Sequence, residues 1–372
     1  MTTASKSESV IVLPMLINGK AYEGAATLDV VNPATEQVIG RVPNASRDDL
    51  DMAVAAARAA FPAWKRKPLA ERQKVIAAFA KAISDNTEEL AALITAEQGK
   101  PLSESMMEVM GAVMWMQAAS TMDLPVTVLE DNADHRVVQR HVPLGVVGAI
   151  VPWNVPVGLG HWKVAPALLA GNTMVLKPSP LTPLSTLRIA ELVRDIVPAG
   201  VYNVVVGGDE LGPWITSHPD IDKITFTGSS ATGRKVMASA SATLKRVTLE
   251  LGGNDAAIVL PDVDIDAVVP DLFWAAFGNC GQVCIAAKRI FVHADIYDRF
   301  RDAFVAYAAS VKVGNGAEAG VQMGPLQNAA QYGRVLKLIN DCRTQGYTFL
   351  TGEAGPPEDQ KGFFVPVTII DN

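Results

Sequence analysis

The apolar and polar positions predict a mostly helical stretch over residues 46–123. Ser46 precedes "RDDLDMAVAAARAAFPAW", in which acidic residues open a stripe of apolar positions at helical spacing, as is typical of a capped helix start. Similar stripes continue through "SMMEVMGAVMWMQAAS", whose methionines we expect to pack against neighbouring helices. Residues 17–43 instead predict short strands and turns.

From residue 145, short apolar runs alternate with helical stretches. The runs are "GVVGAIVP", "TMVLKPS", "YNVVVGG" and "KITFTGS". Runs that are apolar on both faces are typical of buried parallel strands. The alternation predicts an α/β fold with a doubly wound, Rossmann-like parallel sheet, and ligands bind at the carboxyl ends of the strands in that architecture.

Two changes of pattern predict the domain limits. Residues 124–144 place two short runs of branched residues around a polar "DNAD", which indicates a projecting element that is either a β hairpin or a pair of extended arms. A second α/β segment starts after residue 253 and stops within or just after the apolar "GFFVPVTIIDN". We therefore expect a first domain over 1–123 and 145–253, an arm over 124–144, and a second domain over 254–372.

Composition narrows the class of protein. The 372 residues carry a formal net charge of −7, which argues against a nucleic-acid or anionic-membrane partner. Three cysteines are too few for a disulfide framework, and no histidine lies beside them at zinc-like spacing, so we expect no metal. With no signal peptide and no bilayer-spanning run, we expect a soluble cytoplasmic protein with reduced thiols.

Two loops offer reactive side chains. "FGNCGQVCIAAKR" holds Cys280 and Cys284, for which a staple, a metal site, a nucleophile and plain packing are the alternatives. "LELGGN" holds Glu250 between two leucines, where burial would raise its pKa and suit it to general-base catalysis. A helix cap or an ion pair is the alternative for Glu250.

Other loops offer groups that bind anions. In "FTGSSATGRK" a strand ends at Phe226, and Gly228 and Gly233 bracket a helix start whose backbone amides can bind a phosphate. Lys177 ends another strand. The amide of Asn154, after a third, can donate to an oxyanion. A thiol, a carboxylate, an amide and a phosphate cradle are together what covalent hydride transfer from an aldehyde requires.

These motifs as a set closely resemble the NAD(P)-dependent aldehyde dehydrogenase superfamily. "LELGGNDA" resembles its glutamate signature and "FGNCGQVCIAAK" its cysteine signature, while "VVGAIVPWNVP", "GNTMVLKPS" and "FTGSSATG" resemble its cofactor segments. The resemblance implies that Cys284 is the nucleophile, Glu250 the base for the deacylating water, and Asn154 the oxyanion donor. Cys280 matches no catalytic position. The first domain would bind the cofactor, the second would be catalytic, and the arm would serve homo-oligomerisation.

The resemblance also implies two sets of contacts. The expected cofactor contacts are Ile150, Pro152, Trp153, Lys177, Ser179, Phe226, Thr227, Gly228, Ser229, Gly233, Leu251 and Gly252. The expected substrate tunnel consists of Val155, Gly158, Leu159, Trp162, Val283 and Ile285. The small Val155, where many members carry a large aromatic residue, leads us to expect a bulky, apolar aldehyde.

Two departures from the family pattern bear on these expectations. Pro180 stands where many NAD-preferring members carry a glutamate, so we expect NAD or NADP, with NAD slightly favoured. Family members also continue beyond the equivalent of residue 372, so the chain is either a fragment or a natural truncation with a partial catalytic domain.

Three alternatives to an aldehyde dehydrogenase that releases an acid stay open. The chain could be a catalytically impaired, truncated relative that binds nucleotide or a partner subunit. It could be an acylating enzyme that passes the acyl group to coenzyme A, although Glu250 favours water. It could also be a cofactor-free thioesterase, which the nucleotide-like loops disfavour.

Overall fold

The computed structural model describes residues 10–357 and 359–371, and these form two compact units. The first contains residues up to 30, then 40–91 and 106–250. The second contains 31–39, 92–105 and the residues from 251 onward. Residues 1–9, 358 and 372, which the domain prediction includes, lie outside the described residues. The roles assigned to the domains stay predictions.

The predicted helical stretch forms four helices. At the start of α1, Asp49 N donates to Ser46 Oγ (3.2 Å) and Ser46 N donates to Asp49 Oδ2 (2.8 Å), so the two residues cap the helix reciprocally. Helices α3 and α4 pass from one unit into the other along the chain. The bounds are α1 Arg47–Arg66, α2 Leu69–Asp85, α3 Thr87–Gln98 and α4 Leu102–Thr121.

The methionines of α4 only partly follow the expectation of packing. Met116 is fully buried, whereas Met107, Met110 and Met114 are 63%, 53% and 67% exposed. The expectation is therefore wrong for these three, which lie three or four residues apart and share a face of the helix. An apolar stripe at helical spacing reveals a common face but not whether another element covers it.

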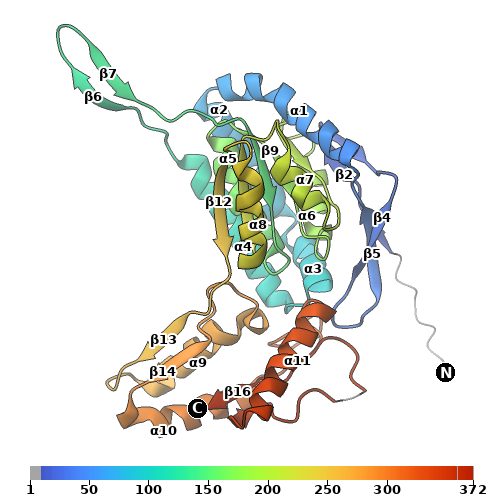
Figure 1. Ribbon diagram of the computed structural model, residues 1–372, viewed down its shortest axis with the longest axis vertical. Coiled ribbons are helices and arrows are strands. Elements are labelled where there is room, and N and C mark those ends of the chain that lie inside the picture. Colours follow the sequence, from blue (N-terminus) through green and yellow to red (C-terminus); the bar gives the residue numbers. More distant parts are fainter. Residues whose placement is uncertain (1–9, 358, 372) are drawn as a thin grey trace. The chain divides into compact units, whose positions relative to one another are not determined.

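A seven-stranded sheet forms the centre of the first unit (Figure 1). Its order is β12-β11-β8-β9-β10-β2-β3, in which β11, β8, β9 and β10 pair in parallel and β2 and β3 complete the edge in antiparallel pairing. The predicted doubly wound parallel sheet is confirmed. The strands are β2 Met15–Ile17, β3 Lys20–Tyr22, β8 Val146–Ile150, β9 Thr173–Lys177, β10 Tyr202–Val204, β11 Lys223–Gly228 and β12 Arg246–Leu251.

Helices pack against this sheet and bury its central strands. Every residue of β9 is buried, as its uninterrupted apolar run predicts. Helices α1 and α5 contact β9, α6 contacts β2, α7 contacts β8 and α8 contacts β11. The connecting helices are α5 Pro156–Leu169, α6 Leu184–Leu192, α7 Leu211–Ser217 and α8 Ser230–Ser241.

The predicted hairpin is present as an antiparallel pair, β6 Thr127–Asp131 and β7 Arg136–Gln139. All of its residues are exposed, and Figure 1 shows it projecting away from the sheet of its unit. A separate small sheet has the order β1-β5-β4, formed by β1 Ile11–Val12, β4 Thr27–Val31 and β5 Val38–Pro43.

The second unit has its own aromatic core. Phe273 stacks on Phe277 with ring centroids 4.8 Å apart and lies 5.8 Å from Phe304. Strands β13 and β14 pair in parallel, and β15 and β16 pair in antiparallel fashion. The elements are β13 Ala256–Val259, α9 Ile265–Phe277, a 3-10 helix Gly278–Gly281, β14 Arg289–Val292, a 3-10 helix Ala294–Ile296, α10 Tyr297–Ser310, α11 Ala329–Thr344, β15 Thr348–Thr351 and β16 Ile369–Asp371.

Within the described residues, no helix has both the length and the apolar character needed to cross a membrane.

Candidate active-site residues

The loop that carries the two cysteines has an unusual backbone. Asn279, Cys280 and Gly281 follow α9 with φ angles of 50°, 58° and 69°. Residues with a side chain rarely adopt this left-handed conformation, and two such residues in succession store strain that the surroundings must offset.

Side-chain amides hold this loop in place. Gln98 Nε2 donates to Asn279 Oδ1 (2.9 Å), and Gln282 Nε2 donates to Asn279 O (3.0 Å). The other end of the Gln282 amide, Oε1, accepts from Gln327 N (3.0 Å). The sequence analysis missed Gln98, Asn279 and Gln327. Only Gln282 carries a signal in the sequence, because it lies two residues before Cys284.

Cys284 is a free, half-buried cysteine. It lies two residues after Gln282, whose amide holds the loop. Its backbone oxygen accepts from Gly253 N (3.1 Å). A Cβ on Gly253 would lie 2.8 Å from that oxygen, so glycine is required for the close approach. The segment that follows Glu250 in sequence therefore contacts the cysteine loop directly.

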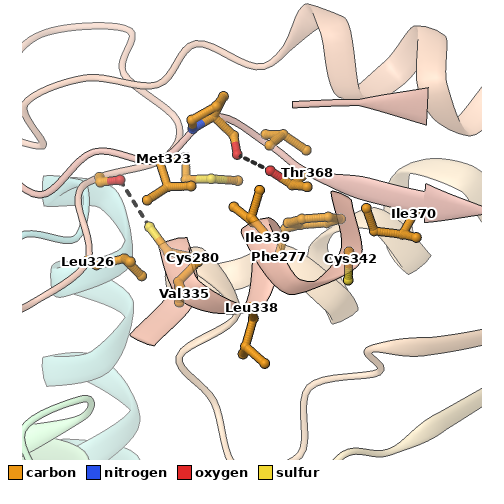
Figure 2. Close-up of a pocket in the computed structure, with 14 residues that line it drawn as sticks. Phe277, Cys280, Met323, Leu326, Val335, Leu338, Ile339, Cys342, Thr368 and Ile370 are labelled. Carbon is orange, nitrogen blue, oxygen red and sulfur yellow. Dashed lines mark hydrogen bonds between the residues drawn. The ribbon is translucent and has the colours of Figure 1, made fainter. Parts of the chain in front are cut away.

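Cys280 has a different environment. Its Sγ donates to Gly324 O (3.0 Å), and burial of the sulfur, with a smaller contribution from Glu104, raises the pKa of the thiol strongly. It lines an apolar cavity of about 270 Å³ that Cys342 also lines (Figure 2). All three cysteines are free, which excludes the staple and leaves Cys280 as a packing residue. No group of His, Cys, Asp or Glu within the described part of the chain is arranged to hold a metal ion.

The expected cofactor contacts of the first unit lie at the carboxyl ends of the parallel strands. Ile150, at the end of β8, pairs with Lys177 of β9 on one side and with Phe226 of β11 on the other. Because these strands are parallel, the loops that carry Asn154, Ser179 and Ser229 leave from the same edge. This register brings together most of the residues predicted for the cofactor.

The glycine-rich turn after β11 is tightly folded. The strand runs two residues beyond the predicted end at Phe226, and Ser229 caps α8 by accepting from Thr232 N (3.2 Å). A Cβ on Gly228 would lie 2.6 Å from the ring of Phe226. The turn is therefore tight at Gly228. Thr232 N is engaged by the Ser229 cap, so an anion would bind the other amides at the start of α8.

Glu250 does not have the buried position that the sequence analysis expects. It lies on β12, the edge strand of the sheet, where exposed and half-buried residues alternate. Leu249 and Leu251 occupy the half-buried face, and Glu250 occupies the exposed face between them. The period of two along a strand is the physical reason why a carboxylate between leucines is exposed here.

Two buried lysines of the first unit, Lys163 and Lys177, have strongly lowered pKa values. Lys163 Nζ donates to Thr227 Oγ1 (2.7 Å) and Thr225 Oγ1 (3.2 Å), and burial lowers its pKa to about 8 against the opposing charge of Glu250. Burial also lowers the pKa of Lys177 to about 8, with Asp209 opposing. The sequence analysis missed Lys163, although a cation inside the apolar stretch of α5 is an unusual feature.

The residues predicted for the substrate tunnel differ in exposure. Val155 and Leu159 are half-buried, and Trp162 is 55% exposed with its ring 6.0 Å from that of Trp115. Gly158 is buried, and a Cβ there would lie 2.9 Å from Val155 Cγ1, so close packing explains this glycine. In the second unit, Val283 is half-buried and Ile285 is exposed.

Comparisons with known proteins give a consistent result. The model of the "Aldehyde dehydrogenase family" matches residues 21–372. A "Probable aldehyde dehydrogenase" of a Pseudomonas species is 44% identical over 98% of this chain and 74% of its own length. The NAD+ complex of an aldehyde dehydrogenase from Bacillus cereus superimposes with a TM-score of 0.93 at 38% identity, covering 96% of this chain and 74% of that chain. An E. coli NADP-dependent enzyme has a TM-score of 0.93 at 35% identity, covering 97% and 76%.

The family model matches almost the whole chain, including the glutamate and cysteine segments, which are hydrogen-bonded to each other through Gly253 N and Cys284 O. The chain belongs to the aldehyde dehydrogenase family, whose members are oxidoreductases that act on aldehydes.

Proposed function

We propose that this chain oxidises a bulky, apolar aldehyde to the carboxylic acid, with NAD or NADP as hydride acceptor and Cys284 as nucleophile. The observation that carries the proposal is the contrast between the two thiols of one loop. Both cysteines are half-buried, but Cys280 donates a hydrogen bond to Gly324 O, faces an apolar cavity and has a pKa that burial of its sulfur raises, whereas Cys284 follows the strained turn that the Gln98 and Gln282 amides hold. A loop built in this way fixes one thiol and leaves the other for chemistry.

The residues at the carboxyl edge of the sheet fit a dinucleotide. The α8 amides and the turn at Gly228, where a side chain would clash, can cradle a phosphate, and Lys177 supplies a cation at the end of β9. When bound, the cofactor supplies a nicotinamide ring that accepts hydride. Pro180 offers no carboxylate to repel the 2′-phosphate of NADP, and we propose NAD as the preferred cofactor with NADP tolerated.

The reaction follows from the chemistry of the side chains. The Cys284 thiolate adds to the carbonyl carbon, and the alkoxide accepts hydrogen bonds from the Asn154 amide and the Cys284 N–H. Once that carbon gives up hydride, which a bound nicotinamide would accept, Cys284 would hold the acyl group as a thioester. Glu250 takes a proton from water, the water oxygen adds to the thioester, and the thiolate leaves as the acid forms.

An apolar surface supports the substrate class. Met107, Met110 and Met114 of α4 are exposed, and Trp115 of the same helix contacts Trp162 of α5. These residues belong to the same unit as Val155 and Leu159. Flexible methionine side chains accommodate apolar groups of varied shape. We therefore propose that the substrate is held by apolar contact rather than by ion pairing.

Assembly and location are also proposed. The hairpin β6–β7 exposes Val128, Leu129, Val137 and Val138, which supports its use as a homo-oligomer contact. The three free thiols support a reducing compartment, and we propose the cytoplasm.

The test is formation of reduced cofactor from NAD or NADP with aromatic and short aliphatic aldehydes. Cys284→Ala should abolish turnover, whereas the matched Cys280→Ala should retain most of it. Turnover that survives Cys284→Ala would contradict the proposal. A folded chain that binds NAD but does not reduce it would favour the alternative of a nucleotide-binding, catalytically impaired relative.

A further inference from the structure

Helix α5 begins at Pro156, two residues after Asn154, without a side-chain cap of its own. Val155 stands at the N-cap position and has no side-chain acceptor, and Pro156 at the first helical position has no N–H. The first backbone donors of the helix are therefore Val157 N and Gly158 N.

A carboxylate from another helix satisfies both donors. Glu108 of α4 accepts from Val157 N (2.8 Å) and Gly158 N (3.0 Å) through the same oxygen, Oε1. Its negative charge lies at the positive end of the α5 dipole, where it is stabilising. Glu108 is half-buried, and the two residues it caps lie 49 and 50 positions further along the chain.

Gly158 lets the first turn pack closely on Val155. A Cβ at that position would lie only 2.9 Å from Val155 Cγ1, while its 3.5 Å distance from Glu108 Cγ is an ordinary contact. A side chain there would press on Val155, the residue next to Asn154. The glycine, the proline and the distant carboxylate thus form one arrangement that fixes the first turn of α5.

We infer that Glu108 is a positioning residue for Asn154. The inference rests on the proposed function, in which the Asn154 amide donates to the developing oxyanion. Such a donor stabilises the transition state only when it is held where the negative charge forms. A displacement of about 1 Å can slow the reaction on the order of 100-fold. Glu108 holds the turn that starts two residues after Asn154 and so limits its movement.

A double-mutant cycle separates positioning from general stability. The measured quantity is the rate of the first turnover, seen as the burst of reduced cofactor, for Glu108→Ala, Asn154→Ala and the double variant. We expect Glu108→Ala to slow the burst about 10-fold or more, and to add almost nothing once Asn154 is already alanine. Glu108→Gln keeps an acceptor oxygen and should restore most of the rate.

Glu88→Ala, which removes an exposed carboxylate from α3, is the matched control and should leave the burst unchanged. An unchanged burst in Glu108→Ala, or a full additional loss in the Asn154→Ala background, would overturn the inference.

A failure of the proposed function would give a different result from a failure of the inference about Glu108. The unmodified chain would then give no burst at all, and Asn154 would have no oxyanion to bind. Amide hydrogen exchange at Val157 and Gly158 is independent of turnover and should become faster in Glu108→Ala. Unchanged exchange there would show that Glu108 does not hold this turn, which overturns the inference on its own.

Discussion

The ammonium of Lys163 lies 2.7 Å from the hydroxyl of Thr227, inside the first unit. Neither threonine that it contacts carries a charge, so the cost of removing this cation from water is offset by two hydrogen bonds to neutral groups and by attraction to Glu250. Glu250 contributes an attraction that is smaller than the effect of burial.

We expect Lys163→Met to stabilise the protein at neutral pH. Burial lowers the folded-state pKa from 10.5 to about 8, so at pH 7 the folded protein bears the full cost of the charge. Removing the charge should raise the free energy of unfolding by roughly 1–3 kcal/mol. The advantage should shrink as pH rises from 8 to 10.5, because the folded wild type then loses its proton before the unfolded chain does.

Urea unfolding at pH 7 and pH 10 measures this difference. Lys235→Met, at an exposed position of α8, is the control and should change little at either pH. A Lys163→Met variant that is less stable at pH 7 would show that the hydrogen bonds to the threonines outweigh the desolvation of the ammonium.

His161 should make the protein sensitive to acid. Its Nδ1 is hydrogen-bonded to Val157 O (2.7 Å), and burial lowers its pKa from 6.5 to about 4. Stability from this group is complete above pH 6.5 and is lost as pH falls toward 4, because only the unfolded chain then takes up a proton. The loss between pH 7.5 and pH 5 should be about 2 kcal/mol.

Comparison with His161→Phe isolates this contribution from that of the carboxylates. Between pH 7.5 and pH 5, wild type should lose about 2 kcal/mol of unfolding free energy relative to His161→Phe. His141→Phe, at an exposed position, should show no such change. Parallel pH profiles for wild type and His161→Phe would exclude His161 as the source of acid sensitivity.

The two cysteines of the loop should differ in reactivity. The raised pKa of Cys280 and its hydrogen bond to Gly324 O keep it as a thiol, and the thiolate is the form that alkylating reagents attack. Brief iodoacetamide treatment followed by peptide mass mapping should modify Cys284 at least about 10-fold faster than Cys280. Equal rates at the two positions would refute the contrast on which the proposed nucleophile rests.

Local patterns in the sequence were sufficient to predict the elements of the fold. Ser46 with the acidic residues after it predicts the start of α1, and the apolar runs predict the parallel strands that meet at Ile150 and Lys177. These features depend on residues close together in the chain, where periodicity and capping chemistry are visible.

The supporting contacts of the site could not be predicted in this way. Glu108 meets Val157 across 49 residues, and Gln98 meets Asn279 across 181, so neither pair leaves a pattern in the local sequence. Alternation along β12 places Glu250 on the face opposite to Leu249 and Leu251, but which of the two faces is covered depends on elements distant in the chain, which the local sequence does not reveal.

Gln282 should be required for the rate of thioester formation. Its amide joins Asn279 O to Gln327 N and so ties the strained turn to the segment after it. Gln282→Ala should slow the burst of reduced cofactor about 10-fold or more. Gln282→Glu should be worse, because a carboxylate oxygen would face Asn279 O with no proton to donate. A Gln282→Ala burst equal to that of wild type would show that the backbone alone fixes Cys284.

Val155→Phe should distinguish bulky from small aldehydes. Val155 is half-buried at the start of α5, in the same unit as the exposed methionines of α4, and a ring at this position would occupy space that we assign to the substrate. We expect kcat/KM for a benzaldehyde-type substrate to fall about 10-fold or more, and kcat/KM for acetaldehyde to change less than about 3-fold.

Val155→Leu is the graded control and should give an intermediate loss on the aromatic aldehyde alone. The split between substrates is what identifies a steric effect, because damage to the Asn154 turn would slow both aldehydes alike. Equal losses on the two substrates would therefore place Val155 in the support of Asn154 and remove it from the substrate tunnel.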